Sequence, residues 1–342
     1  ELCPQLERSG WALANLASLP HISVAGACAT GTHGSGISNG CLSTQIEEIE
    51  LLTAGGDLIT LTEADERFSS AAVGLGALGI VTALTLKLQQ RFSIVQYVYE
   101  HIPLAEFVTD LLGTMSRAYS VSLFTTWKDP LFADIWSKQV VADDVAFSIE
   151  PESFFNVEPT RRDRHPSILG KPDVCTDQRS VGPWHLRLPH FRPDRPPATG
   201  NELQSEYFVP WNHAQKAIAA ICKLEPQFRD VLILSEIRAI AEDRFCLSPF
   251  NGRDSLSIHF SWHNDWAAVR AVLPLVENVL MASDVRPHWG KLFSFSYQFF
   301  EAVYGLSFQQ FLSVAADLDP LGKFRNSFLD RNIFEVEGGR RL

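Results

Sequence analysis

Apolar and polar positions alternate along several stretches of the chain, and each such stretch predicts a β-strand. Two alternating runs flank the turn sequence "AGGD" at 54–57, so we expect a hairpin over 44–62. Further strands are predicted at 80–88, 92–99, 121–127, 207–209, 231–240 and 255–262. We therefore expect one sheet near the N-terminus and a second sheet that begins at about residue 92.

Apolar positions at helical spacing predict helices between and after these strands. The predicted helices span 6–16, 104–118, 266–281 and 306–318, with a further helix ending at 224 and a short helix or turn within 61–72. This mixture indicates an α+β fold, and 342 residues suggest two domains or one domain with a large insertion. Residues 128–200 are rich in Pro, Arg and Asp, so we expect a long loop there without core elements.

The sequence "GLGALG" has the glycine spacing of a dinucleotide-binding fingerprint, with Gly74, Gly76 and Gly79 at the fingerprint positions. That fingerprint requires a strand before the glycines and a helix after them. Here a short helix or turn precedes the glycines and a strand follows, which is the inverted order. The glycines therefore indicate a tight turn or a close backbone approach, and a nicotinamide-binding site is the lesser alternative.

Composition and charge narrow the possible partners of the chain. The net charge of -11 argues against nucleic acid, whose binding depends on clustered Lys and Arg. No apolar run approaches the ~20 residues of a membrane span and no secretory signal is visible, so we expect a cytoplasmic monomer without a membrane partner. Six cysteines lack C-x-x-C pairs and companion histidines, so we expect reduced thiols and no metal site.

The segment "VAGACATGTHGSGISNG" at 24–40 combines glycines with small and hydroxyl side chains. Such a segment allows several backbone N–H groups to converge on an anion, as in a phosphate-binding nest. It is not a Walker loop because the Gly-Lys-Ser/Thr ending is absent. A flexible surface loop is the alternative, although Ala25, Ala27 and Ala29 would then be poorly placed in solvent.

Two predicted strands carry side chains suited to binding a polyol. Glu236 and Arg238 are two residues apart and share one face of their strand. On the other strand, Ser257, His259 and Ser261 share a face. If the two strands are neighbours, one sheet face presents a carboxylate, a guanidinium, an imidazole and hydroxyls together. The alternative is the solvated face of an antiparallel sheet.

Several motifs in the same order resemble one family. They are "SVAGACATGTHGSG", "VGLGALGIVTALTL", "ELQSEYFVP", "SEIR", "SIHFSW", "RPHWGK" and "DPLGKFRNSF". Together they resemble the sugar-oxidase branch of the vanillyl-alcohol-oxidase superfamily, with alditol oxidases nearest and aldonolactone oxidases sharing "HWGK". The resemblance implies a PCMH-type FAD-binding domain at 1–95, a sheet-and-helix cap at 96–295, and a return to the first domain at 296–342.

The implied reaction is oxidation of a sugar alcohol's terminal hydroxyl to the aldehyde, with hydride passing to FAD and then O2 reduced to hydrogen peroxide. By resemblance, Arg238 and Lys291 contact the reacting hydroxyl and Glu236 the adjacent one. Ser35, His259 and Ser261 orient the other hydroxyls, and His259 is the best titratable candidate for a general base. The implied cofactor-binding residues are Ser23, Gly26, Thr30, Gly31, Thr32, His33, Gly34, Ser35, Gly36, Gly74, Gly76, Gly79, Ile80 and Val81.

The chain departs from the family in several places. Relatives begin with a first flavin subdomain that has no counterpart in this sequence, so we expect a partial FAD-binding domain that binds FAD weakly or not at all. An aldonolactone oxidase or dehydrogenase and a non-catalytic remnant are the alternatives. A polar, insertion-like stretch at 150–180 could alter substrate access. In "GPWHLRLPHF", Trp184, His185 and His190 either line the substrate entrance or pack the loop.

Overall fold

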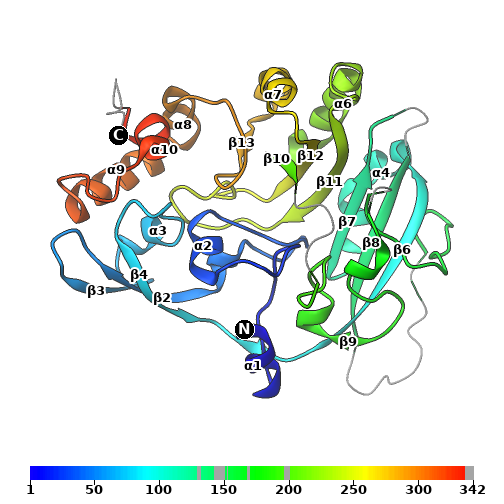
Figure 1. The fold of residues 1–342 in the computed structure, drawn as a ribbon, viewed down its shortest axis with the longest axis horizontal. Coiled ribbons are helices and arrows are strands. Elements are labelled where there is room, and N and C mark those ends of the chain that lie inside the picture. The colour runs from blue at the N-terminus through cyan, green and yellow to red at the C-terminus, as the bar shows by residue number, and fades with distance from the viewer. Residues whose placement is uncertain (129–131, 142–150, 152, 168–169, 196–200, 336–342) are drawn as a thin grey trace.

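A computed structural model describes residues 1–128, 132–141, 151, 153–167, 170–195 and 201–335. The described chain forms one large and one small antiparallel sheet, each packed against helices, and a further two-stranded sheet, so it is an α+β fold (Figure 1). The small sheet and the C-terminal helices lie at one end of the molecule and the large sheet extends to the other end. The glycine-rich N-terminal segment passes between them.

The large sheet has eight strands in the order β13-β10-β12-β11-β7-β8-β6-β9. Its strands are β6 (Ser93–Pro103), β7 (Ser120–Thr125), β8 (Phe132–Val141), β9 (Gly182–Pro183), β10 (Glu202–Pro210), β11 (Leu232–Ile240), β12 (Ser255–His263) and β13 (Arg286–Pro287). All of its neighbouring strands pair antiparallel. The central position of β12 places its residues against both β10 and β11.

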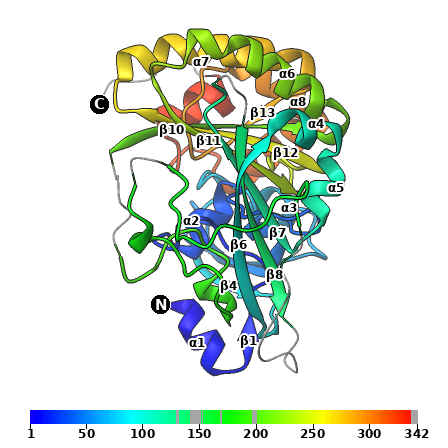
Figure 2. The same ribbon diagram turned by 90° about the vertical axis from the view of Figure 1, so that its right-hand side faces the viewer.

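Helices cover one face of this sheet (Figure 2). They are α4 (Leu104–Thr109), α5 (Leu111–Ser116), α6 (Ala214–Leu224) and α7 (Trp266–Leu280). Side chains such as Ile218, Ile258 and Val276 interlock there in the main core. Trp266–Ser283 is long and apolar enough to cross a membrane. In this fold, however, α7 packs its buried side on the sheet as a core helix does.

The small sheet has the order β3-β2-β4, with β2 (Ile46–Leu52), β3 (Leu58–Thr62) and β4 (Ile80–Leu86). A second core joins it to a short helix between β3 and β4 and to helices near the C-terminus. These are α3 (Phe68–Ala71), α8 (Tyr297–Tyr304), α9 (Leu306–Leu318) and α10 (Ser327–Leu329). This core therefore combines residues that precede the large sheet in the sequence with residues that follow it, and Trp289 and Leu247 also pack into it. The predicted domain boundaries stay a prediction.

The "GLGALG" segment does not form a nicotinamide-binding unit. Helix α3 precedes it, and β4 follows it and pairs antiparallel with β2. This order is the inverted one that the flanking sequences predicted. Gly79 has φ +154°, and a Cβ there would lie 2.8 Å from the Leu52 carbonyl oxygen. The glycine therefore permits a close approach to β2.

Most predicted elements are present within a few residues. The hairpin, the strands β4, β6, β7, β10, β11 and β12, and the helices α6, α7 and α9 are confirmed. The helix predicted over 6–16 is wrong: α1 (Leu2–Arg8) ends before Gly10, whose φ of +84° breaks the helix. Trp11–Ala12 instead forms β1 and pairs with β5 (Gln89–Gln90).

Two other predictions need correction. The helix expected over 104–118 divides at Asp110, whose side chain accepts a hydrogen bond from the Gly113 N–H and so caps a new helix, α5. The expected loop over 128–200 contains β8, which pairs with β6 and β7 inside the large sheet. The polar residues of "DIWSKQ" concealed this strand, because one of its faces packs against other polar groups rather than against water.

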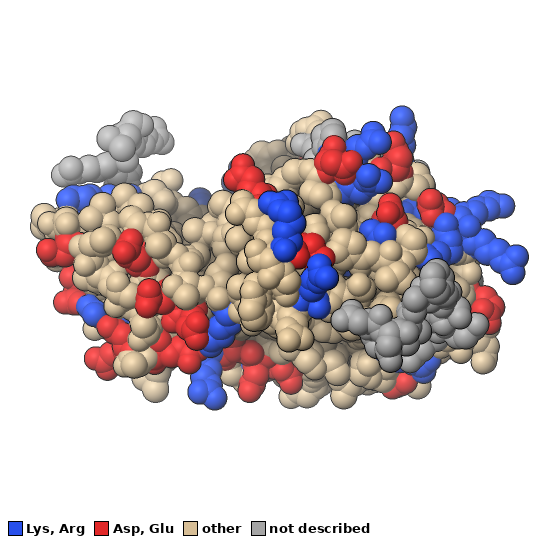
Figure 3. All heavy atoms as spheres, turned by 90° about the horizontal axis from the view of Figure 1, so that it is seen from below, with Lys and Arg blue, Asp and Glu red and all other residues tan. Residues whose placement is uncertain are grey.

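One face of the molecule shows how its charges are distributed (Figure 3). Acidic side chains gather toward the end that holds the small sheet, and basic side chains lie mostly toward the other end. This face carries no continuous basic surface of the kind that binds a phosphate backbone.

Candidate active site

Three adjacent strands build the polar face that the sequence predicted. In the register of the sheet, His259 of β12 is the Cα partner of Glu236 on β11 and of Glu206 on β10. Side chains directly opposite each other on neighbouring strands project from the same face. The conditional prediction about neighbouring strands is therefore confirmed, and one additional carboxylate, Glu206, joins the row.

This polar face forms one wall of a cavity of about 610 Å³. Glu236, Arg238, His259, Ser261 and Lys291 all line it, so the structure brings these five predicted residues together. The volume lies within the range of small-molecule sites in proteins. The opposite wall comes from the glycine-rich segment, where Ser23, Gly26, Thr30, Thr32 and His33 are lining residues.

Glu206 is the central anion of the site, and the sequence analysis missed it. Its side chain is fully buried, and its two carboxylate oxygens accept hydrogen bonds from Arg238 Nη2 and Lys291 Nζ, both at 2.6 Å. Burial alone would raise the pKa of Glu206, but Arg238 and Lys291 hold it well below its usual value. Strand alternation in "ELQSEYFVP" was the signal that could have found it, because Glu206 shares a face with Gln204.

Lys291 is well placed to donate to a ligand. Its ammonium group donates to Glu206 Oε2 at 2.6 Å and to His259 Nδ1 at 2.7 Å. Since an ammonium has three N–H donors, one remains for a molecule in the cavity. Burial lowers the pKa of Lys291, and the nearby Glu206 charge opposes that effect. Lys291 is thus a largely buried cation at the cavity wall. Its position after a glycine would alone suggest a solvated surface lysine.

His259 differs from the general base that the sequence suggested. Because Lys291 donates to Nδ1, the proton of the neutral ring lies on Nε2, 3.2 Å from Ser261 Oγ. Burial, together with the Lys291 charge, lowers the pKa of His259. In this arrangement its lone pair is already occupied, so His259 is suited to orient Lys291 and Ser261 rather than to take a proton directly from a ligand.

The second carboxylate, Glu236, has different partners. Its Oε1 lies 2.8 Å from His190 Nε2 and 3.5 Å from Arg238 Nε. Burial would raise its pKa, but Arg238 and His190 lower it far below the usual value. His190 also lines the cavity, whereas Trp184 and His185 pack beneath the loop, Trp184 against Phe92. His190 therefore lines the cavity, whereas Trp184 and His185 pack the loop.

The glycine-rich segment is more ordered than a flexible surface loop. It contains α2 (Val24–Ala29), and the Gly26 N–H donates to the N-cap hydroxyl of Ser23. The Gly31 and Thr32 N–H groups also bond within the segment, and that of Gly36 bonds to Ala239. These four amides are therefore used within the protein, and the predicted anion nest stays a prediction. The small residues let the segment lie close to the large sheet.

Other predicted residues lie outside the cavity lining. Ser35 donates its hydroxyl proton to the Val121 carbonyl and lies beside the Ala239 N–H, so it joins the segment to the sheet. A Cβ on Gly34 would lie 2.3 Å from the Leu16 carbonyl oxygen, which explains the glycine. The remaining cofactor candidates away from the lining are Gly31, Gly36, Gly74, Gly76, Gly79, Ile80 and Val81. Their roles stay predictions.

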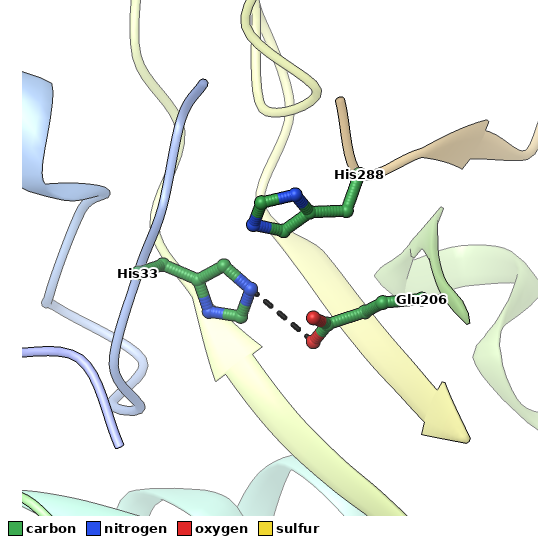
Figure 4. Close-up of side chains that lie close together, drawn as sticks. All are labelled: His33, Glu206 and His288. Atoms are coloured by element: carbon green, nitrogen blue, oxygen red, sulfur yellow. Dashed lines mark ion pairs between the residues drawn. The ribbon is translucent and has the colours of Figure 1, made fainter. Parts of the chain in front are cut away.

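His33, Glu206 and His288 have the residue types of a metal site, and their ligand atoms lie within 4.8 Å of one another (Figure 4). Their hydrogen bonds oppose that role. The Gly290 N–H donates to His288 Nδ1, which leaves the proton of the neutral ring on Nε2, the atom a metal would need. Glu206 is already neutralised by two cations. The arrangement favours shared protons over a coordinated metal ion.

Comparison with known proteins identifies the family. The D-arabinono-1,4-lactone oxidase family model matches residues 201–332. The chain is 43% identical to an alditol oxidase of Streptomyces sp. (strain IKD472 / FERM P-14339) over 96% of its own length and 77% of that protein. The chain belongs to the alditol oxidase family, within the vanillyl-alcohol-oxidase superfamily. This alditol oxidase homologue is also 24% identical to the L-gulonolactone oxidase of Bos taurus, over 97% of the chain and 78% of that protein.

Solved structures support the same fold for the alditol oxidase homologue. A solvent-stable cholesterol oxidase matches with a TM-score of 0.74 and 13% identity, covering 96% of this chain and 79% of that one. A cholesterol oxidase from B. sterolicum matches with a TM-score of 0.75 and 12% identity, covering 96% and 78%. The α+β fold predicted for this family member is therefore confirmed.

Proposed function

We propose that the protein oxidises the terminal hydroxyl of a sugar alcohol such as xylitol or sorbitol, using FAD. The balanced reaction is R–CH2OH + O2 → R–CHO + H2O2. The observation that carries the proposal is the convergence of Glu236, Arg238 and Lys291 in one cavity of a chain that is 43% identical to an alditol oxidase. Two cations suit a hydroxyl oxygen that gains negative charge, and a carboxylate suits a neighbouring hydroxyl donor.

The residues of the cavity fit a flat, partly polar cofactor ring. Small side chains at Ser23, Gly26 and Ala27 allow such a ring to lie close to the main chain. Lys291 and Arg238 supply positive charge on the facing wall. FAD, when bound, supplies the acceptor for the hydride that leaves the substrate carbon. We propose that these residues, with Thr30, Thr32 and His33, hold the redox-active end of FAD.

The protein's own groups bind and orient the substrate. The free N–H of Lys291 donates to the reacting hydroxyl oxygen and stabilises charge that develops there. Glu236 accepts a hydrogen bond from the adjacent substrate hydroxyl, and Ser261 is placed to bond with a hydroxyl further along the polyol. Glu206 pairs with Lys291 and Arg238 and so holds their charged groups in place at the cavity wall. Because these groups are buried and already oriented, little reorganisation is needed during the reaction.

An aldonolactone is the second candidate substrate. The D-arabinono-1,4-lactone oxidase family model covers β10 to β13, the part of the chain that supplies Glu206, Glu236 and Lys291. The same two cations could face an oxygen of a lactone ring. The use of an electron acceptor other than O2 also fits the dehydrogenases among the relatives. Cytoplasmic location and a monomeric state stay predictions.

The test is to load the purified protein with FAD and to measure peroxide with xylitol, sorbitol and gulonolactone, in parallel with an artificial dye acceptor. We expect peroxide with the polyols and flavin reduction by them under anaerobic conditions. Lys291→Met should lower kcat about 100- to 1000-fold, because it removes a donor aimed at developing charge. Lys216→Met, a change at an exposed lysine of α6, is the matched control and should leave activity unchanged. Activity with lactone alone, or with dye alone, would contradict the proposal.

A further inference from the structure

A lysine is buried in the large sheet behind the proposed substrate site. Lys138 lies on β8 and is only 1% exposed. Its ammonium group donates to the Leu188 carbonyl, to the Pro189 carbonyl at 3.0 Å and to His190 Nδ1 at 3.2 Å. All three N–H donors of the ammonium are therefore used. No donor remains for a molecule in the cavity, so Lys138 acts on the protein alone.

These bonds determine which nitrogen of His190 carries the proton. Since Nδ1 accepts from Lys138, the proton of the neutral ring lies on Nε2 and points at Glu236 Oε1, 2.8 Å away. Burial, with the Lys138 charge, lowers the pKa of His190 to about 4, so the ring is neutral at physiological pH. The rings of Phe124 and Trp136 pack edge-on against the His190 ring, with ring centroids 5.4 and 5.5 Å from its centroid, and fix its plane.

The opposite tautomer would be unfavourable here. It would place the Nε2 lone pair against the Glu236 carboxylate and an N–H against the Lys138 ammonium. With the observed tautomer, Glu236 Oε1 is held by His190, and among the described residues no donor lies within hydrogen-bond distance of Oε2. One carboxylate oxygen is thereby anchored and the other left for a ligand.

We propose that Lys138 and His190 are positioning residues that hold Glu236 in the orientation that recognises a substrate hydroxyl. This inference rests on the proposed function, and it adds a relay that begins on β8, two strands away from Glu236 across the sheet. The pair touches no reacting atom. Its contribution is to select the tautomer of His190 and, through that, to fix the carboxylate.

The relay should make substrate binding depend on pH. Burial lowers the pKa of Lys138 to about 7, with Glu236 and Cys175 raising it and Arg238 and Arg187 lowering it. As pH rises through this value, the lysine loses a proton and keeps two N–H donors for three acceptors. His190 is then free to adopt either tautomer. Glu236 loses its fixed donor, so KM for the polyol should rise above about pH 7.

The experiment uses the FAD-loaded protein and four variants. His190→Leu removes the donor, and His190→Gln restores one, because the amide nitrogen of Gln reaches the position of Nε2. Lys138→Met removes the ammonium. Gln96→Met is the matched control, since Gln96 is equally buried and pairs with Lys138 in the sheet but lies outside the relay. We measure kcat and KM for xylitol across pH and the unfolding midpoint of each variant.

We expect His190→Leu to raise KM about tenfold or more, as the loss of a hydrogen bond to a charged group implies, with kcat changed far less. His190→Gln should recover most of that loss, and Lys138→Met should flatten the rise in KM above about pH 7. Gln96→Met should lower stability without changing KM. Equal KM values in the wild type and His190→Leu, or no rescue by Gln, would overturn the inference.

A measurement independent of turnover separates this inference from the proposed function. Nitrogen-15 NMR of the histidines reports which ring nitrogen is protonated, with or without substrate. We expect His190 to carry its proton on Nε2 in the wild type and to lose this preference in Lys138→Met. An Nδ1-protonated His190 in the wild type would reject the relay. Failure to oxidise any polyol, with the expected tautomer present, would reject only the function.

Discussion

The eight-stranded and the three-stranded sheet differ in which residues they bury and which they expose. On β12 of the large sheet, Ser257 and His259 are at most 8% exposed, although they form the polar half of an alternating strand. In the small sheet, Leu58 of β3 and Ile80 of β4 are 59% and 53% exposed, although both side chains are apolar. These places are therefore exceptions of opposite kinds to the usual rule for antiparallel sheets, which puts apolar residues inside and polar residues outside.

The difference shows where to look for chemistry. Burying charged groups is unfavourable unless they pair, so a buried polar face is kept only with a network around it. Glu206 and Glu236 are balanced by Arg238 and Lys291, which leaves these four groups neutral overall. Single exposed apolar side chains on a sheet carry no comparable penalty and are common on protein surfaces. The large sheet therefore supplies the polar wall of the site.

Glu206→Gln should have the largest effect, because it breaks the network on the large sheet. The substitution keeps the shape of the side chain but leaves Arg238 and Lys291 buried without their common counter-charge. Removing one member of a buried ion pair lowers the free energy of unfolding by about 3–5 kcal/mol. Urea unfolding monitored by tryptophan fluorescence measures the change. The control is Glu47→Gln on the exposed part of β2, for which we expect no measurable change.

The same variant also tests how the network works. Losing the Glu206 charge should further lower the pKa of Lys291, because that carboxylate is the partner that opposes desolvation. Activity should then fall at a lower pH than in the wild type. Unchanged stability together with an unchanged pH profile would mean that the two cations find other counter-charges, and the contrast between the sheets would lose its electrostatic basis.

Sequence periodicity predicted much of the fold because it reports where apolar side chains recur. It located α9, the hairpin and the three strands that build the site. It failed at β8, where Lys138 lies on a buried face and makes a core strand resemble a loop. It also failed at Gly10, because a single left-handed residue ends a helix whose apolar spacing continues.

The site shows the same limit. Glu236, Arg238 and His259 were found because each motif places them on one face of a strand. Alternation along β10 places Glu206 on one face with Gln204, but its position opposite His259 depends on the register between β10 and β12, a long-range pairing that alternation alone does not give. The hydroxyl of Ser35 bonds to the Val121 carbonyl, a contact between residues distant in sequence that no local pattern indicates, and its role toward a ligand stays a prediction.

Acid should weaken the large sheet more than the small one. His33, His190, His259 and His288 are buried in the large sheet's site, and burial lowers the pKa of each. Between pH 6.5 and 4 the unfolded state binds protons that the folded state does not, so stability falls as pH is lowered. For His190, a pKa lowered from 6.5 to about 4 corresponds to roughly 3 kcal/mol at full protonation.

Hydrogen exchange, corrected for intrinsic rates, compares the sheets directly. Amides of β12 should lose protection between pH 6.5 and 4, while those of β2 should lose less, since β2, β3 and β4 contain no histidine. His190→Gln provides the control, because it removes one titrating group and should reduce the acid sensitivity of β12. Equal loss of protection in both sheets would indicate a single unfolding unit and would remove this distinction.

The smallest effect is expected for an exposed residue of the small sheet, compared with a buried residue of the same strand. Leu58 and Leu61 both lie on β3, but Leu58 is 59% exposed and Leu61 is fully buried. Leu61→Ala should lower the free energy of unfolding by about 2–5 kcal/mol, because it leaves a cavity in the second core. Leu58→Ala should change it by no more than about 0.5 kcal/mol. Urea unfolding of the matched pair measures both. A cost at Leu58 close to that at Leu61 would mean that this apolar face is covered in solution, and the contrast with the buried polar face of the large sheet would then rest on β12 alone.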